Sequence, residues 1–157
     1  MRIRLFRSVD APALARIFHA AVHQIGALHY SLEQLDAWAP VVPDPGRFLE
    51  QGADGRILLV AADNGDRPLA FGDLEQNGHI DHLYCRPDVA GTGVASALYD
   101  QLEAAAEDRG MGRLQVEASE PARRFFLRKG FILLQRREFT LDGVAIHNFA
   151  MEKLLDA

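Results

Sequence analysis

Two Asn-Gly pairs separate three short apolar segments, and this pattern constrains the fold more than any other feature of the sequence. The segments are residues 57–62, 69–75 and 79–85, each of a length typical of a β-strand, and the pairs are Asn64-Gly65 and Asn77-Gly78. Asn-Gly favours the positive φ angles of tight hairpin turns. The sequence therefore predicts three consecutive antiparallel strands.

Hydrophobic period and capping residues predict the elements before this region. Alternation of charged and apolar residues predicts a strand at 2–7, and apolar residues at three- and four-residue spacing predict a helix at 11–26. Ser31 and Gln34 resemble a capping box, which would begin a short helix that ends at Trp38.

The stretch that contains Pro43, Pro45 and Gly46 is expected to be a loop, because proline and glycine interrupt regular structure. After the third strand we expect a helix at 94–109, a strand at 114–117, a helix at 120–129 and a closing hairpin of strands 131–139 and 144–151. Together these elements predict one domain, residues 1–157, of the α+β class (α/β mixed), with about seven strands in a mixed, mostly antiparallel sheet and about four helices beside it.

Charge and composition narrow the classes of function. A formal net charge of −5 argues against a nucleic-acid partner and mildly favours a cationic small molecule. The apolar runs are far shorter than the roughly 20 residues of a membrane-spanning helix, and the N-terminus lacks a signal-peptide stretch, so no membrane contact and a cytoplasmic location are expected. Cys85 is the only cysteine and the histidines are scattered, so neither a disulfide nor a metal site is expected.

The stretch from residue 83 to residue 98 carries the strongest chemical signal. A predicted strand enters a loop with Gly91 and Gly93, and a predicted helix begins directly after it. Unpaired amides and the helix dipole make such a terminus a site for a pyrophosphate, although an ordinary structural turn also fits the pattern. A dinucleotide-binding loop, for which Ser96 and Glu117 stand at nearly suitable positions, is rejected. The loop is too long for a tight first turn, and about 60 residues after it cannot complete a doubly wound sheet.

Two segments together resemble the GNAT superfamily of acetyl-CoA-dependent N-acetyltransferases. They are residues 86–95, Arg-Pro-Asp-Val-Ala-Gly-Thr-Gly-Val-Ala, and residues 122–131, Ala-Arg-Arg-Phe-Phe-Leu-Arg-Lys-Gly-Phe. Residues 30–40 and 148–153 are similar to a subgroup of small bacterial acetyltransferases. The resemblance covers nearly the whole chain and implies a GNAT-like central sheet whose fourth and fifth strands are splayed.

The resemblance also implies how acetyl-CoA, the expected cosubstrate, would bind. Backbone groups of three strand residues would pair with the pantetheine arm, namely Leu83, Tyr84 and Cys85. Main-chain amides at the helix start would hold the pyrophosphate, and the residues of this loop are Ala90, Gly91, Thr92, Gly93, Val94, Ala95 and Ser96, with Ala90 at a position that usually carries glutamine or arginine. Ser119 and Phe125 would lie near the pantetheine arm, but Ser119 also fits a plain helix N-cap and Phe125 also fits core packing.

Acetyl transfer to an amine requires a proton acceptor, because an amine with a pKa of about 10.4 is almost entirely protonated at neutral pH. Asp81 and His82 are both candidates for the general base. The choice stays open, because a bulge that the resemblance implies near this point would exchange the faces on which they lie. Glu117 is a further candidate. The amide of Leu83 is the expected donor to the thioester carbonyl oxygen. The departing thiolate would be protonated by Tyr84 or by a water, or would leave without a proton donor.

The acceptor pocket is expected among the first two helices and the last hairpin. Its candidate residues are Tyr30, Trp38, Glu117, His147 and Asn148. The predicted function is transfer of an acetyl group to a primary amine of a small molecule or peptide by direct attack, and a homodimer is compatible with the resemblance. The alternative is a catalytically inactive CoA-binding regulatory domain, because Phe126 stands where the family often has a proton-donating tyrosine.

Overall fold

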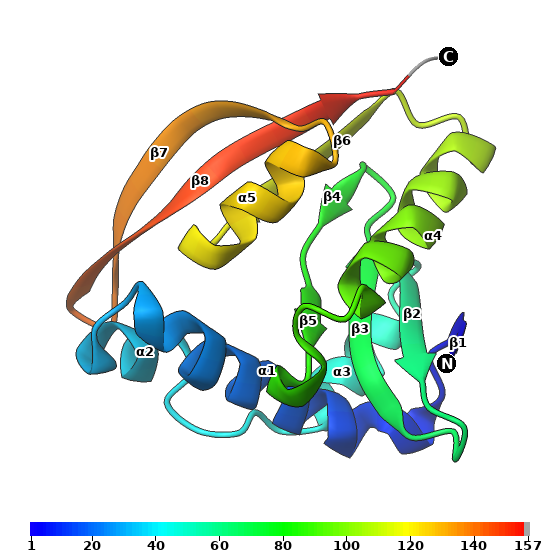
Figure 1. Cartoon of the computed structure of the whole chain (residues 1–157), viewed down its shortest axis with the longest axis horizontal. Helices are drawn as coiled ribbons and strands as arrows, with labels where there is room; N and C mark the ends of the chain where they lie inside the picture. The colour runs from blue at the N-terminus through cyan, green and yellow to red at the C-terminus, as the bar shows by residue number, and fades with distance from the viewer. Residues whose placement is uncertain (156–157) are drawn as a thin grey trace.

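The computed structural model describes residues 1–155, which form two four-stranded β-sheets (Figure 1). The first sheet is antiparallel and has the order β1 (Arg2–Leu5), β2 (Ile57–Ala62), β3 (Pro68–Leu74), β5 (Leu83–Cys85). The second has the order β4 (His79–Ile80), β6 (Arg113–Ala118), β8 (Val144–Leu154), β7 (Ile132–Leu141). In this second sheet β4 is parallel to β6 and the other pairs are antiparallel. The mixed α+β class is confirmed, with eight strands in two sheets in place of about seven in one.

Within residues 1–155, five α-helices surround the sheets. They are α1 (Ala11–Ile25), α2 (Leu32–Trp38), α3 (Gly46–Gly52), α4 (Val94–Asp108) and α5 (Glu120–Arg128). Three short 3₁₀ helices join them: η1 (Ser8–Asp10), η2 (Gly26–Leu28) and η3 (Pro87–Val89). Helices α1 and α3 pack on one face of the first sheet around Phe18, Phe48 and Phe71, and α4 packs on its other face through Leu98. Helix α5 packs with the second sheet through Phe126, in a cluster that also contains Leu74 of β3 and Tyr99 of α4, so this core joins the two sheets.

The predicted strand at 79–85 is divided between the two sheets. Its first part, β4, pairs with β6, whereas its second part, β5, pairs with β3. Figure 1 shows β4 and β5 as consecutive arrows at the junction of the two sheets, with β6 running away from β5 toward the upper edge. The predicted fourth and fifth strands therefore meet at one end and separate at the other, which confirms the splayed arrangement.

A β-bulge and a buried aspartate cause this division. The Asp73 amide donates to the His82 carbonyl at 3.1 Å, and the Glu75 amide donates to the His79 carbonyl at 2.8 Å. Two residues on the β4–β5 side therefore stand opposite one on β3, which is the count of a bulge. The Asp73 Oδ1 atom accepts the amides of Asp81 (2.9 Å) and His82 (2.8 Å), so a side chain replaces the missing ladder partner.

The helix α3 was not expected, and the prediction of a loop around Pro43, Pro45 and Gly46 is wrong at its end. Pro45 takes helical angles (φ −54°, ψ −28°) at the cap, and the helix begins at Gly46. Phe48, which is fully buried against Phe71, provides the tertiary contact that stabilises it. Among the described residues, no helix combines the length and apolar character needed to cross a membrane.

Candidate functional site

The N-terminus of α4 has the open backbone that an anion requires. Gly93 occupies the cap position with φ 91° and Gly91 has φ 78°, both in the left-handed region that favours glycine. Within residues 1–155 no side chain caps this terminus, and the amides of the first helical turn, from Val94 to Ser96, have no partner inside the helix. The Thr92 amide differs, because it donates to the carbonyl of the preceding 3₁₀ helix at 3.3 Å.

Lys129 lies beside this helix terminus, and the sequence analysis did not single it out. Its Nζ atom donates to Ser96 Oγ at 2.6 Å and to Asp100 Oδ1 at 2.8 Å. Lys129 belongs to residues 122–131, the second segment that resembles the GNAT superfamily, and this was the sequence signal that could have identified it. A cation at this position adds positive potential next to the open amides.

Strand β5 offers a free edge to the space between the sheets. The His82 carbonyl accepts from β3 at 3.1 Å and the Arg86 amide donates to β3 at 2.8 Å. Bonded positions alternate along an antiparallel ladder, so the backbone polar groups of Tyr84 face β3 and those of Leu83 and Cys85 face the open side. Leu83 and Cys85 are therefore placed to pair with an added extended chain.

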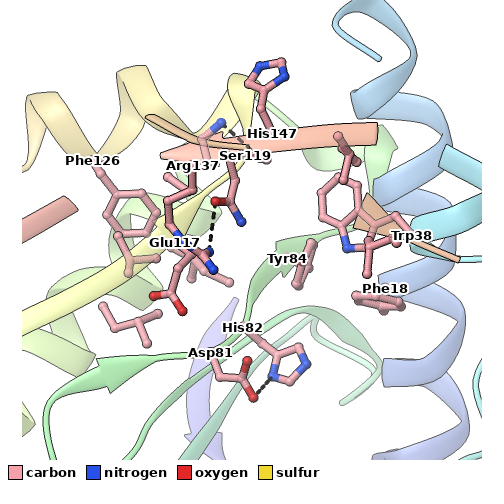
Figure 2. A pocket seen from close by; sticks show the side chains of 18 of the residues that line it. Phe18, Trp38, Asp81, His82, Tyr84, Glu117, Ser119, Phe126, Arg137 and His147 are labelled. Atoms are coloured by element: carbon pink, nitrogen blue, oxygen red, sulfur yellow. Dashed lines mark hydrogen bonds and ion pairs between the residues drawn. The ribbon is translucent and has the colours of Figure 1, made fainter. Parts of the chain in front are cut away.

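A cavity of about 380 Å³ lies between the splayed strands, and residues of α1 and α5 line it. All five residues predicted for the acceptor pocket line it: Tyr30, Trp38, Glu117, His147 and Asn148. The four predicted catalytic residues line it as well: Asp81, His82, Leu83 and Tyr84. Figure 2 shows Asp81 and His82 on one side of the cavity, with Glu117, Tyr84 and Trp38 around it.

His82 is held by a buried network at the base of the cavity. Its Nδ1 atom lies 2.8 Å from Asp73 Oδ2, and its Nε2 atom lies 3.0 Å from Arg47 Nη2. A guanidinium only donates, so Nε2 is the accepting nitrogen and Nδ1 carries the proton that it donates to Asp73. Both side chains of this pair are almost fully buried. This tautomer presents the basic lone pair of His82 on the Nε2 side.

Asp73 is the residue of the network that sequence reasoning missed. Burial alone would raise the pKa of this carboxyl, but the hydrogen bonds that it accepts from His82 and Arg56 hold its pKa below the usual value. Arg56 Nη1 donates to Asp73 Oδ2 at 2.8 Å. The available signal was an acidic residue inside an otherwise apolar strand, where an unpaired charge is strongly disfavoured.

Asp81 and Glu117 line the cavity with carboxylates that already have cationic partners. Asp81 Oδ2 accepts from Arg56 at 3.0 Å, and its side chain is 37% exposed. Both Glu117 oxygens lie within 3.1 Å of His79 Nε2. The hydrogen bond to Glu117 is the largest of the effects that raise the pKa of His79 to about 9, so His79 is a cation at neutral pH.

Asp73, Asp81 and His82 also bring ligand atoms within 4.8 Å of one another, a spacing that suits a metal ion. The Arg56 guanidinium bonds to both carboxylates, at 2.8 Å and 3.0 Å. It thus occupies the position that a cation would take. The arrangement supplies the carboxylates with a fixed positive charge from the protein itself.

The surroundings of Tyr84, Phe126 and Cys85 decide what each can contribute to the reaction. Burial is the main cause that raises the pKa of Tyr84 well above its usual value, so its hydroxyl stays protonated in the cavity wall. Phe126 is buried against Phe131 and lines the same cavity, but it has no proton to give. Burial also raises the pKa of the Cys85 thiol, which disfavours the thiolate that a nucleophilic cysteine needs.

The remaining cofactor candidates occupy less central positions. Ser119 lines the cavity, and its Oγ caps α5 by accepting the Ala122 amide at 3.4 Å, as a plain N-cap would. Phe125 packs edge-on against Tyr99 and Phe126 in the core of the second sheet. Ala90 is exposed just before the glycine loop.

The far wall of the cavity combines predicted aromatic residues with an arginine that sequence reasoning missed. The Tyr30 hydroxyl accepts the Glu120 amide at 2.9 Å and donates to the His147 carbonyl at 3.1 Å, which fixes it in place. Arg137 Nη1 donates to Asn148 Oδ1 at 3.0 Å across the β7–β8 pair. No sequence motif marks Arg137, because only the pairing register of the hairpin brings it to the cavity.

Comparison with known proteins gives a consistent result. The family model described as an acetyltransferase (GNAT) domain matches residues 27–153. An Escherichia coli (strain K12) protein, the uncharacterized N-acetyltransferase YafP, is 32% identical over 96% of this chain and 94% of its own length.

Solved structures show the same similarity. A GCN5-related N-acetyltransferase from Rhodopseudomonas palustris, also described as an aminotransferase of class II, has a TM-score of 0.90 at 36% identity, with 98% of this chain and 95% of that chain covered. YncA of Salmonella typhimurium, solved with acetyl-CoA, has a TM-score of 0.76 at 18% identity over 100% of this chain and 95% of that chain, which shows a shared fold.

Proposed function

Because this chain belongs to the GNAT acetyltransferase family and is an acyltransferase, we propose that it transfers an acetyl group from acetyl-CoA directly to a primary amine. One observation carries the proposal. The free edge of β5 and the buried His82 meet at one cavity, and β5 leads along the chain into the open helix terminus of α4. These are the parts that thioester binding and amine activation require.

The residues at the α4 terminus fit acetyl-CoA as cosubstrate. Added Cβ atoms at Gly91 and Gly93 would meet nothing within 4 Å, so ligand oxygens have room to approach the backbone. The open amides of the first turn supply the positive field for a pyrophosphate, beside Lys129, whose charge is paired with Asp100. Leu83 and Cys85 would then pair with the pantetheine arm along the open edge of β5.

His82 is the general base that the geometry favours over Asp81. Its accepting nitrogen is assigned to Nε2, and Asp73 fixes the opposite nitrogen as the donor. Asp81 instead faces Arg56, and protonation of a carboxylate in that pair would leave the guanidinium without part of its counter-charge. The incoming amine would displace Arg47 from His82 and lose its proton to Nε2, directly or through a water.

Two further steps complete the proposed reaction. The outward-facing amide of Leu83 would donate to the thioester oxygen as negative charge develops on it. The departing thiolate would take a proton from Tyr84 or from a water, or would leave unaided, because burial raises the pKa of Tyr84 and so makes its hydroxyl a weaker acid. A thiol is a tolerable leaving group at neutral pH, so the absence of a tyrosine at position 126 does not remove a required group.

The test is a thiol-release assay with acetyl-CoA and a panel of amines. We expect turnover with at least one amine, and His82→Gln should lower kcat by about 10²–10⁴-fold with little change in the KM for acetyl-CoA. His29→Gln is the control, because His29 is exposed and lies outside the cavity. Absence of turnover together with tight CoA binding would favour the inactive alternative, and a full-rate His82→Gln variant would exclude His82 as the base.

A further inference from the structure

We propose that the amine acceptor also carries a carboxylate, which Arg137 binds on the wall of the cavity opposite His82. This inference rests on the proposed acetyl transfer and names the acceptor class for the same cavity. It differs from the preference for a cationic ligand that the net charge of the chain suggests. It follows from which charges in the cavity already have partners.

The carboxylates of the cavity wall already have cationic partners, Arg56 for Asp81 and His79 for Glu117, although Arg56 also pairs with Asp54 and Asp73. Asp81 Oδ2 lies 3.0 Å from Arg56 Nη1, and both oxygens of Glu117 face His79 Nε2 at 3.0–3.1 Å. The pKa of His79 is raised to about 9, chiefly by that hydrogen bond to Glu117, which keeps this partner charged at neutral pH. A cationic acceptor would therefore have to compete with partners that are covalently part of the chain.

The positive charges of the same wall are not balanced. Arg47 and Arg137 both line the cavity, and over residues 1–155 neither has a carboxylate oxygen within 4 Å. Their polar contacts are neutral: Arg47 Nη2 lies 3.0 Å from His82 Nε2, and Arg137 Nη1 lies 3.0 Å from Asn148 Oδ1. A partly enclosed guanidinium without a counter-charge favours an anionic ligand.

Arg137 is held in an orientation suited to binding. Asn148 stands directly opposite it in the β7–β8 register and anchors one end of the guanidinium. The ring of Phe139 lies 5.4 Å from its central carbon and supports its plane. The remaining guanidinium N–H groups can donate to the two oxygens of a carboxylate. Figure 2 shows the Arg137 head group above the cavity, with His82 on the other side.

Apolar side chains form much of the remaining wall of the cavity. They are aromatic and aliphatic, namely Phe18, Trp38, Tyr84, Phe139, Leu141 and Ile146. An acceptor that places its amine at His82 and its carboxylate at Arg137 would bury its remaining atoms against this surface. The chemistry of the cavity thus describes an amino acid with an apolar side chain.

Three amines with the same phenylethyl group separate the contribution of the carboxylate from that of the apolar part. L-Phenylalanine carries the carboxylate, L-phenylalaninamide replaces it with a neutral amide, and 2-phenylethylamine lacks it. We expect the wild-type enzyme to acetylate L-phenylalanine with a kcat/KM at least about 10-fold above that of the other two. A hydrogen bond to a charged group contributes about 1.5–3 kcal/mol, which is about 10- to 150-fold.

Arg137→Gln should remove this preference, and Arg136→Gln is its matched control. The variant should lower kcat/KM for L-phenylalanine by about 10- to 100-fold, mainly through KM, and change that for 2-phenylethylamine by less than about 3-fold. Arg136 is the neighbour on the same strand, but its side chain is 54% exposed and faces Glu138. Its substitution should change neither substrate, and both variants should keep the wild-type melting temperature within a few degrees.

Binding measurements separate failure of this inference from failure of the proposed function. Calorimetric titration of the three probes into the CoA-saturated protein should show L-phenylalanine binding that Arg137→Gln weakens, whether or not acetyl transfer occurs. Equal use of L-phenylalanine and 2-phenylethylamine, or an equal loss for both in Arg137→Gln, would overturn the inference and leave acetyl transfer standing. No binding of L-phenylalanine at all would overturn it as well.

Discussion

Replacement of Asp73 by asparagine tests the buried network on which the proposed mechanism depends. The four hydrogen bonds to this carboxylate are known individually. Oδ1 accepts the amides of Asp81 (2.9 Å) and His82 (2.8 Å), and Oδ2 accepts His82 Nδ1 and Arg56 Nη1, both at 2.8 Å. An asparagine side chain has almost the same shape, but it presents one oxygen and one NH₂ group.

The expected cost follows from that count. The amide oxygen can keep the two backbone donors, but the NH₂ group then faces the two donors that Oδ2 accepted. Loss of two hydrogen bonds to a charged group, at about 1.5–3 kcal/mol each, gives roughly 3–6 kcal/mol. Arg56 keeps its contacts with Asp54 and Asp81, which offsets part of this loss. We therefore expect Asp73→Asn to lower the free energy of unfolding by about 3 kcal/mol.

The same substitution should reduce activity. Without an acceptor at Nδ1, His82 loses the contact that fixes its tautomer, and Nε2 no longer carries the lone pair in every molecule. We expect kcat to fall by at least about 10²-fold, a typical contribution of a general base. The KM for acetyl-CoA should change little, because the α4 terminus lies outside this network.

Urea denaturation and steady-state kinetics on the same protein samples provide the measurement. Asp54→Asn is the control, because Asp54 contacts the same Arg56 but is 43% exposed, and its loss should cost less than about 1 kcal/mol. The pKa of Asp73 is lowered in the folded state, so its stabilisation is present above the unfolded pKa and is lost as pH falls through the folded value. The difference between wild type and Asp73→Asn should therefore shrink in acid. An unfolding free energy within about 0.5 kcal/mol of wild type at pH 7 would refute this account of the network.

Three further predictions concern other parts of the site. Gly93→Ala should raise the Kd for CoA by about 10-fold or more and destabilise the fold by about 1–2 kcal/mol, because residue 93 has φ 91°. Calorimetry should show neither effect in the control Gly112→Ala, because Gly112 does not have a positive φ angle. The pKa of His79 is raised to about 9, so its contribution to stability is full below its unfolded pKa of about 6.5 and is lost as pH rises through 9. Denaturation curves should show the unfolding free energy of wild type falling by about 1–2 kcal/mol across this pH range, and that of His79→Asn falling much less. The expected value is kept small because Glu117 is 41% exposed and solvent screens the pair. If Tyr84 protonates the departing thiolate, Tyr84→Phe should lower kcat by about 10- to 100-fold without changing the KM for acetyl-CoA, and an unchanged kcat in the thiol-release assay would remove Tyr84 as the acid.

The order of elements and the helix terminus of the site could be predicted from the sequence because they depend on local chemistry. Asn77-Gly78 and Asp142-Gly143 occur at chain reversals, and Gly78, Asp142 and Gly143 have the positive φ angles that such pairs favour. Ser31 caps α2, with its Oγ accepting the Gln34 amide at 3.1 Å. Signals of this kind need only neighbouring residues, so they are visible without tertiary structure.

The general base could not be chosen from the sequence because strand alternation fails where the bulge occurs. A regular strand would place Asp81 and Leu83 on one face and His82 on the other. The bulge removes Asp81 and His82 from both sheets and sends His82 into the core beside Phe71, whereas Asp81 stays near the surface. What fixes this arrangement is Asp73, a residue of a different strand, so no window of sequence around 81–82 contains the information.

Net charge is a poor guide to the acceptor for a related reason. The value of −5 describes the whole chain, but a bound ligand responds mainly to groups within about 8 Å, the screening length of physiological solution. Inside the cavity the carboxylates Asp81 and Glu117 pair with Arg56 and His79, which come from other strands or loops, whereas Arg137 contacts an amide. Arg137 is therefore a positive group of the cavity wall without a carboxylate in contact among residues 1–155, although the chain as a whole is negative. An acidic protein can thus select an amine that also carries a carboxylate, because pairing within the fold, and not composition, decides which charges remain for the ligand.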